Sequence, residues 1–523
     1  MFLFYLFILL SNIILFQSEK LIFVESFFRH GARAPIKLND DGLDVLGVKW
    51  STPGELTPIG KRMEYILGLY NRKRYITGKN KFLSEKFDPH ELIVYSSDLN
   101  RTLLSATSLI QGLYPMSPDM GDKLTPEQFN ISFPPLNISY EDYTEELNLL
   151  NDSALPNYMT VIPIHVISLK NTTKECEEKV KDINNNNSKN KKIISDFIEN
   201  FNKNYSEILN SFYGRPKDTF LDFTFINAFF DGLVADLTEG NDVSQFFRMN
   251  NLNINEFLEK RYDVIASYFR DYIFGDDDSQ VVLFFNTPLL KNMLNYMKRK
   301  IEDDINGYPS LKNVSDYSRP KMVLISSHDT TLSAIEMFFI KYFELGIESY
   351  KYPIYTSQIN FEITREEDDI IIKEKNEIKN LKYSDYKVSY YFNDKVLLNI
   401  TFDKFVEKIE NVVWNNEQMD RFCFGDKKEK EEKKEEEKEE EKEEEKEEEE
   451  KEEEEEEEKE REEEKEEEEK VEGSLIIIML MGIIILILAV TLIFLITKLK
   501  KKSDEEFDEN FKDNKLINDD KEE

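Results

Sequence analysis

The sequence predicts an α/β fold, with a mostly parallel sheet flanked by helices, an inserted and largely helical cap domain, and a C-terminal transmembrane helix. Three short apolar segments that each end in polar residues predict the sheet, at 21–28, 91–95 and 321–325. The second and third segments are followed by apolar residues at helical spacing. Because strands buried on both faces are near-continuous apolar runs, we expect the three segments to be parallel strands of one sheet.

A change of composition between the second and third strands predicts the cap. Residues 113–215 are rich in Asn and Pro, and residues 216–275 carry apolar side chains at helical spacing. We therefore assign about 113–280 to a largely helical insertion. Its Phe residues are more typical of a core than of a substrate platform.

The N-terminus resembles a secretory signal. Residues 2–16 are apolar apart from Ser11 and Asn12, and charged residues begin at Glu19. This length suits the apolar part of a signal peptide. We expect a signal peptide at 1–18, cleaved after Ser18, although no basic residue precedes the apolar run. The alternative interpretation is a buried N-terminal strand.

The C-terminal third contains a second apolar segment. Residues 475–497 carry no charge and are long enough to span a bilayer. Lysines at 498 and 500–502 follow, and the positive-inside rule then places the tail, 498–523, in the cytoplasm. The sequence therefore predicts a type I single-pass membrane protein with an ectodomain at 19–425, in the lumen or outside the cell.

Charge is concentrated before this segment. The chain has Asp+Glu 104 against Lys+Arg 68, a net charge of -36, and residues 426–473 are almost entirely Glu and Lys. Such an excess disfavours nucleic acid as a partner. Without apolar residues the run cannot be a coiled coil. A solvated spacer and a lone helix supported by Glu–Lys pairs both remain open, and either would form a stalk above the membrane.

The predicted ectodomain carries glycosylation motifs that agree with a luminal or extracellular location. The acceptor sites are Asn130, Asn137, Asn151, Asn171, Asn186, Asn204, Asn313 and Asn399. A ninth motif, at Asn100, lies in a segment with candidate active-site residues, and we expect it to be unused.

The polar residues after the three strands supply three arginines, two histidines and one aspartate. They are Arg29, His30, Arg33, Arg101, His328 and Asp329. Ligands bind outside the carboxyl ends of strands in open α/β sheets, so we expect these side chains to meet. Arginine forks match phosphate oxygens, and histidine can act as nucleophile or base. With neither a glycine-rich phosphate loop nor a metal-ligand set in the sequence, the pattern favours phosphoryl transfer without a metal.

The motifs resemble those of a known family. Arg29-His30-Gly31-x-Arg33-x-Pro35 resembles the signature of the histidine acid phosphatases, and His328-Asp329-Thr-Thr resembles their second signature in the prostatic and lysosomal type. Ser97-x-x-x-Arg101-Thr is similar to the segment with the family's third phosphate-binding arginine. The resemblance covers about 20–425.

The resemblance implies a role for each residue. His30 would attack phosphorus and become a phosphohistidine, while Asp329 would protonate the leaving alcohol and then activate water. The phosphoryl oxygens would be held by Arg29, Arg33, Arg101 and His328. This implies an acid phosphatase that acts on phosphate monoesters of small molecules or proteins and needs no cofactor or metal.

The chain also departs from this family type, whose members carry several disulfides. Only Cys176 and Cys423 are present. They either form one bond or remain free, and an oxidising compartment favours the bond.

Alternative interpretations remain open. The activity could be that of a phytase-like inositol-polyphosphate phosphatase of the same superfamily. A catalytically inactive stalked receptor or adhesion ectodomain is the alternative from another class. A homodimer is also left open. The tail motif at 513–517 is close to an acidic dileucine signal, so we expect the endolysosomal membrane, with the cell surface as the alternative.

Overall fold

The computed structural model divides the chain into two units, 1–425 and 426–523. It describes residues 18–425 with gaps, together with 482 and 484–498. The gaps are at 45, 79–80, 133, 135, 137–139, 168–172, 187, 244–246, 249–251, 257–258, 260–267, 269, 271–273, 275–279, 308–318 and 368–380. The predicted stalk, residues 499–523 of the predicted cytoplasmic tail and residues 1–17 of the predicted signal peptide lie outside the described residues.

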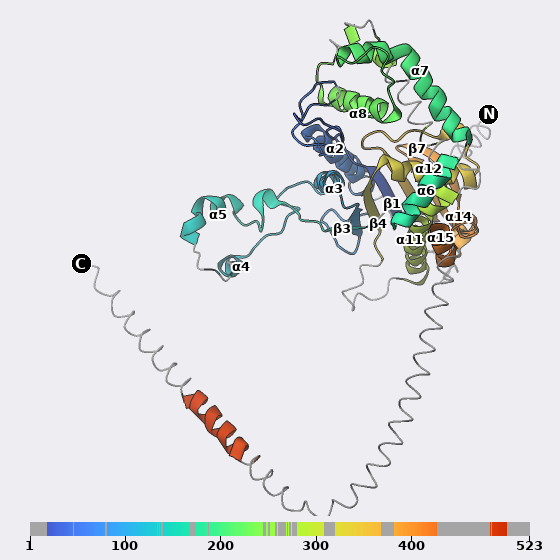
Figure 1. Ribbon diagram of the computed structural model, residues 1–523. Helices are drawn as coiled ribbons and strands as arrows, with labels where there is room; N and C mark the ends of the chain where they lie inside the picture. The colour runs from blue at the N-terminus through green and yellow to red at the C-terminus, as the bar shows by residue number, and fades with distance from the viewer. Residues whose placement is uncertain are drawn as a thin grey trace, which may run out of the picture. The chain divides into compact units, whose positions relative to one another are not determined.

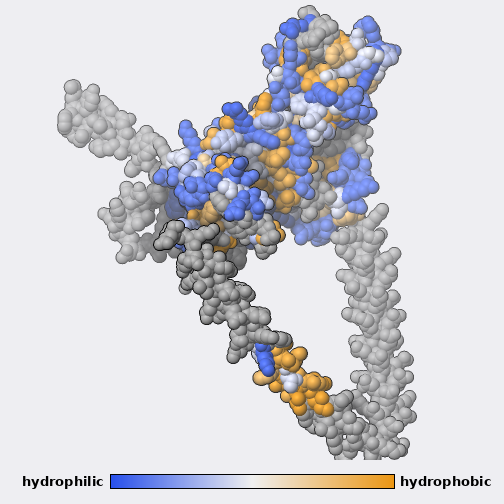
Figure 2. Space-filling view, turned by 90° about the vertical axis from the view of Figure 1, so that its left-hand side faces the viewer, coloured by the Kyte–Doolittle hydropathy of each residue, from blue (hydrophilic) through white to orange (hydrophobic). Residues whose placement is uncertain are grey.

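The second unit is described as a short helix at 484–498. Its surface is hydrophobic apart from one end (Figure 2). No helix in the described part of the chain is both long and apolar enough to cross a membrane. Residues 475–481 and 483 of the predicted transmembrane segment are not described.

The first unit contains a sheet with the strand order β3-β2-β4-β1-β5-β6-β7. Its parallel half consists of β1 (Ser18–Arg29), β2 (Leu92–Ser96), β3 (Ile164–Val166) and β4 (Met322–Ser327). The three segments predicted from apolar runs are β1, β2 and β4, and they lie next to one another (Figure 1).

The other half of the sheet corrects the expectation of a mostly parallel arrangement. Strands β5 (Gln358–Glu367), β6 (Tyr386–Phe392) and β7 (Lys395–Thr401) pair in antiparallel fashion, starting from β1. The sheet is therefore mixed. A two-residue turn at Asn393 and Asp394 joins β6 to β7, and so short a connection permits only antiparallel pairing.

Helices cover both faces of the sheet because side chains along β1 and β4 alternate between two cores. Phe23 and Phe27 face α11 (Gln280–Asn306), α12 (Asp329–Tyr342) and α14 (Phe402–Glu410). Val24 and Phe28 face α2 (Pro58–Tyr75) and α3 (Asn100–Leu113). The helix α15 (Asn416–Phe424) follows α14.

The described residues of the predicted insertion at 113–280 are mostly helical, but the insertion also contributes a strand to the sheet. It contains β3, which pairs with β2 inside the sheet. Its helices are α4 (Pro126–Ile131), α5 (Thr144–Leu150), α6 (Lys174–Asn186), α7 (Ser188–Phe212) and α8 (Phe223–Glu239), and short 3-10 turns lie at Tyr140–Tyr143 and Pro156–Tyr158.

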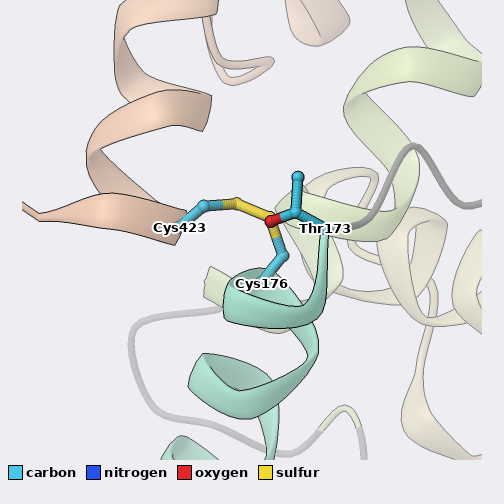
Figure 3. Close-up of a disulfide and its surroundings, with 3 residues drawn as sticks. All are labelled: Thr173, Cys176 and Cys423. Atoms are coloured by element: carbon cyan, nitrogen blue, oxygen red, sulfur yellow. A yellow bond between two sulfur atoms is a disulfide. The ribbon is translucent and has the colours of Figure 1, made fainter. Parts of the chain in front are cut away.

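Two parts of this region pack differently. A disulfide between Cys176 and Cys423 joins α6 to α15, with the Thr173 hydroxyl beside it (Figure 3). Helices α7 and α8 lie side by side (Figure 1) and share their own apolar core, in which Phe201 contacts Phe230. Of the helices in the predicted insertion, α7 and α8 contribute side chains to the pocket described below.

Candidate active site

The site lies where β1, β2 and β4 end. The register places Arg29 opposite Ser327 and Ser96 opposite Ser326, so the three strands end at the same level. One pocket at this edge contains all six residues singled out from the sequence. Its lining includes Arg29, His30, Arg33, Arg101, His328 and Asp329.

His30 is buried directly after β1, and its ring is held in one tautomer. The backbone N–H donates to the Ser327 carbonyl at 3.1 Å, and Nδ1 lies 2.9 Å from the Gly31 carbonyl oxygen. Because a carbonyl oxygen can only accept, Nδ1 carries the hydrogen and Nε2 keeps its lone pair. Burial and then the Arg29 and Arg33 cations hold the pKa of His30 well below its usual range. His30 is therefore neutral and keeps a lone pair on Nε2, as a nucleophile or a base requires.

Gly31 allows the motif loop, which follows β1 and carries the motif that ends at Pro35, to approach α2. A Cβ at this position would lie 2.4 Å from the Gly60 carbonyl oxygen, so a larger residue would push the loop away. The Gly31 N–H also donates to Ser105 Oγ on α3 at 3.1 Å. Together these contacts fix the backbone on which His30 stands.

Arg29 connects the end of β1 to the start of α12. Its Nη2 lies 2.9 Å from Asp329 Oδ2, and its Nη1 donates to the Pro353 carbonyl at 2.8 Å. The guanidinium lies 4.6 Å from the ring centre of Tyr355 and 5.5 Å from that of Tyr352. The cation thus lies over two aromatic rings, which attract it.

Arg33 is paired with a residue that the sequence analysis did not single out. Asp231 on α8 accepts from Arg33 Nη2 at 2.9 Å and from Nη1 at 3.1 Å, and its Oδ2 also accepts from the Ile36 N–H at 2.8 Å. In the sequence, Asp231 is a carboxylate directly after a Phe pair, which is unusual for a core helix. Nothing in that pattern indicates that it reaches Arg33.

Arg101 stands in the first turn of α3. No carboxylate among the described residues lies within 4.0 Å of its guanidinium. Burial and then the Arg33 cation lower the pKa of Arg101. Arg29, Arg33 and Arg101 also each keep a buried Nε without a hydrogen-bond partner in the described part of the chain. A pocket with three such donors is suited to an anion.

His328 and Asp329 are brought to the pocket by the turn from β4 into α12. His328 is the N-cap residue, its Nε2 lies 2.9 Å from Ser97 Oγ, and its ring centre lies 5.5 Å from that of His30. Asp329 opens the helix, where the helix dipole favours negative charge. Its Oδ1 accepts from the Thr330 N–H at 2.9 Å.

The remaining oxygen of Asp329 has two partners. Oδ2 accepts from the Tyr352 hydroxyl at 2.8 Å and pairs with Arg29. Burial acts to raise the pKa of Asp329, but the Arg29 cation and the Tyr352 hydrogen bond outweigh it, and the pKa lies below its usual value. Tyr352 was not predicted from the sequence, because the tyrosine-containing segment before β5 carries no motif.

The outer wall of the pocket carries several apolar side chains, with the polar Asn227 and Lys37 among them. The apolar side chains come from α7, α8 and two neighbouring segments and include Phe197, Phe223, Ile226, Phe230, Tyr268 and Ile36. Beyond the three arginines, Lys37 is the only Lys or Arg among the described lining residues. His90 and His165 do not line this pocket.

Some predicted modification sites can be placed. Asn151, Asn204 and Asn399 are exposed, whereas the surroundings of the other five predicted acceptors are not described. Asn100 is exposed too, and its amide donates to Glu55 Oε1 at 3.0 Å. Glycosylation stays a prediction. The described residues contain no group of three or more His, Cys, Asp or Glu side chains arranged to hold a metal ion.

Comparison with known families gives a match over most of the chain. The model of the histidine phosphatase superfamily (branch 2) matches residues 20–379.

Individual relatives match over shorter segments. Lysosomal acid phosphatase of Xenopus laevis is 37% identical over 108 residues, which are 21% of this chain and 24% of that protein. Prostatic acid phosphatase of Homo sapiens is 39% identical over 118 residues, 22% of this chain and 28% of that protein. The chain thus spans about a quarter of the length of these relatives. Among solved structures, the phytase of Citrobacter braakii aligns with 76% of this chain and 98% of its own, at 14% identity and a TM-score of 0.44.

Proposed function

Because the chain belongs to branch 2 of the histidine phosphatase superfamily, we propose that it is an acid phosphatase that hydrolyses phosphate monoesters through a phosphohistidine intermediate. One observation carries the proposal. A neutral His30, with its lone pair on Nε2, shares a pocket with three arginines whose buried Nε groups lack partners among the described residues. This combines a nucleophile with a site for an anion.

In the first step, Nε2 of His30 attacks phosphorus and forms the N–P bond while the P–O bond to the alcohol breaks. Arg29, Arg33, Arg101 and His328 hold the phosphoryl oxygens and stabilise their charge in the transition state. The leaving oxygen takes the proton of Asp329, so that a neutral alcohol departs.

In the second step, water attacks the phosphorus of the phosphohistidine. The Asp329 carboxylate accepts a proton from that water, the N–P bond breaks, and its electron pair returns to Nε2. Inorganic phosphate leaves, and Asp329 is again protonated for the next cycle. Side chains of this chain supply the nucleophile, the positive charge and the proton, so neither step calls for a cofactor.

An acid optimum follows from the surroundings of Asp329. In the free site, Arg29 favours its carboxylate form and lowers its pKa. A bound phosphoryl dianion would engage Arg29 and place negative charge beside Asp329, and both changes raise the pKa of Asp329. We therefore expect turnover to be fastest at acid pH, where the bound state contains protonated Asp329.

The outer wall favours simple monoesters over inositol polyphosphates. Each further phosphate would need its own cations, yet Lys37 is the only additional Lys or Arg among the described lining residues, and Phe197, Phe223 and Phe230 face the space instead. We propose that the ester's alcohol carries apolar groups that contact this wall. A catalytically inactive receptor is the weaker proposal, because all six site residues meet in one pocket.

We also propose that the protein enters the secretory pathway by its signal peptide and is anchored at 475–497 in the endolysosomal membrane, with 426–473 as a stalk and glycans on its ectodomain. The apolar terminal segments and the exposed acceptors Asn151, Asn204 and Asn399 support this. Surface biotinylation that labels most of the protein at steady state would contradict the endolysosomal location.

The activity is tested with the full-length protein in detergent. Hydrolysis of a generic aryl phosphate and of inositol hexakisphosphate is measured between pH 3 and pH 9, with and without a chelator. The proposal predicts aryl phosphatase activity that peaks in acid and persists with chelator. An alkaline optimum, loss of activity with chelator, or a strong preference for the inositol polyphosphate would contradict it.

A further inference from the structure

Tyr352 contacts the reacting groups without belonging to any of the motifs. Its side chain lines the pocket, and its hydroxyl donates a 2.8 Å hydrogen bond to Asp329 Oδ2. The same oxygen lies 2.9 Å from Arg29 Nη2. Tyr352 and Arg29 therefore hold one oxygen of the carboxyl group from two sides, while the Thr330 N–H holds the other.

The segment that carries Tyr352 is fastened along one face of α12. The Tyr350 hydroxyl lies 2.9 Å from Ser333 Oγ, and the Lys351 N–H donates to Glu336 Oε1 at 3.2 Å. Residues 329, 333 and 336 lie on one face of the helix. Three consecutive residues, 350–352, thus contact three positions along the helix that begins with Asp329.

The same segment also holds Arg29. Pro353 accepts a hydrogen bond from Arg29 Nη1 at 2.8 Å, and the Tyr355 ring lies against the guanidinium. The position of Tyr352 is therefore fixed from both neighbours, so its hydroxyl is aimed at Asp329 before any substrate binds. Such preorganisation is what a supporting group contributes to a catalytic carboxyl.

We propose that Tyr352 is a positioning residue for the reaction: its hydroxyl orients the carboxyl group of Asp329 and sets the pH above which that group loses its proton. This inference rests on the proposed function. When a phosphoryl group binds to Arg29, the pairing of Arg29 with Asp329 Oδ2 weakens. Among the described contacts, Tyr352 is then the side chain that still binds Oδ2, so its influence on the pKa of Asp329 is largest in that state.

The charged and titratable groups around Asp329 determine whether loss of the Tyr352 hydroxyl raises or lowers the pKa of Asp329. Arg29 comes from β1, Arg33 from the loop after it and Arg101 from α3; His328 precedes Asp329 on the chain, and Tyr350 and Tyr352 come from the segment before β5. The cations favour the carboxylate, and so does the hydrogen bond that Tyr352 donates. Removing that donor therefore raises the pKa of Asp329, so the acid keeps its proton at higher pH.

The test compares the full-length wild type with Tyr352→Phe and with Tyr386→Phe, a control outside the pocket that removes a buried hydroxyl donating to Asp304 Oδ2 at 3.0 Å. The pH profile of kcat, which reports the ionisation of groups in the substrate complex, is measured with a simple alkyl phosphate, whose poor leaving group needs the acid. For Tyr352→Phe we expect the alkaline limb to move up by about one pH unit and kcat at the optimum to fall roughly tenfold. Inhibition by inorganic phosphate should change less than kcat, and Tyr386→Phe should leave the limb in place.

Three results would overturn the inference while leaving the proposed function standing. They are an unmoved limb in Tyr352→Phe, an equal displacement in Tyr386→Phe, and a rate loss that is the same at every pH and for activated aryl esters. A purely structural role would give the last of these. If the wild type itself formed no phosphohistidine, the proposed function would fail instead. Thermal unfolding of each variant confirms that it is folded.

Discussion

The carboxylate of Asp231 accepts hydrogen bonds from both Nη atoms of Arg33, at 2.9 and 3.1 Å. This contact joins α8 to the motif loop after β1, and a third hydrogen bond from the Ile36 N–H strengthens it. The arginine is thereby held in one orientation in the pocket, and the apolar wall of α8 is held above it.

Asp231→Asn should therefore impair both catalysis and stability. The amide keeps one acceptor but loses the charge, so we expect kcat/KM to fall about tenfold and the free energy of unfolding to fall by about 1–3 kcal/mol. Denaturant unfolding and steady-state kinetics measure the two effects. The control is Glu417→Gln, which removes an exposed ion pair with Arg421 and should change neither. Equal effects of the two substitutions would contradict this account.

Asp329→Asn should act selectively on poor leaving groups. The amide cannot donate a proton to the departing oxygen, so alkyl phosphates should lose roughly 100-fold or more in rate, whereas activated aryl esters, which leave without help, should lose much less in the first step. A leaving-group series at several pH values checks this. An equal loss across the series would show that Asp329 is not the acid.

The fold should be more stable near pH 5 than near pH 8. Burial raises the pKa of Glu25 to about 8, and burial together with the neighbouring Asp44 raises the pKa of Asp236 to about 8. Because both values lie above those of the unfolded chain, the stability that they contribute is full below about pH 4 and is lost as the pH rises through 8. The thermal midpoint should therefore fall between pH 5 and pH 8.

Asp236→Asn should flatten that dependence, since the amide cannot ionise beside Asp44. Differential scanning calorimetry at several pH values measures it, with the exposed Asp218→Asn as the control that keeps the wild-type slope. A midpoint that rises toward pH 8 in the wild type, or an unchanged slope in Asp236→Asn, would contradict the prediction.

The disulfide between Cys176 and Cys423 should stabilise the fold without serving the chemistry. It joins α6 to α15 across a sequence separation of 247, and neither cysteine lines the catalytic pocket. Replacing both with Ser should lower the free energy of unfolding by about 2–5 kcal/mol and leave the pH profile at low temperature unchanged. A reductant should do the same to the wild type, and an unmoved unfolding midpoint in both cases would refute the role.

The sequence was sufficient for the parts of the site that belong to strands and motifs. Apolar runs located β1, β2 and β4, and because these strands are neighbours, the residues after them share one pocket. The sequence was not sufficient to predict the antiparallel half of the sheet. The pairing there depends on β5 binding at the edge of β1, which is a tertiary contact. The sequence analysis also missed β3, whose three residues are too short to show a pattern.

The missed site residues share one cause. Asp231 and Tyr352 reach the pocket only through tertiary contacts, with Arg33 and Asp329, that join positions far apart in the chain. A carboxylate after two Phe residues and a tyrosine before Pro353 carry no periodic signal for such a contact. Side chains that act through another residue are therefore harder to find than those that stand in a motif.

The central claim is that Nε2 of His30 takes the phosphoryl group. The most direct measurement is rapid quenching in alkali, where phosphohistidine survives, after mixing the full-length protein with substrate at acid pH, followed by mass spectrometry of its peptides. The account predicts a phosphoryl group on His30 in the wild type and none in a folded His30→Ala variant, which should also lack turnover. A phosphoryl group on another residue, or substantial activity in folded His30→Ala, would contradict it.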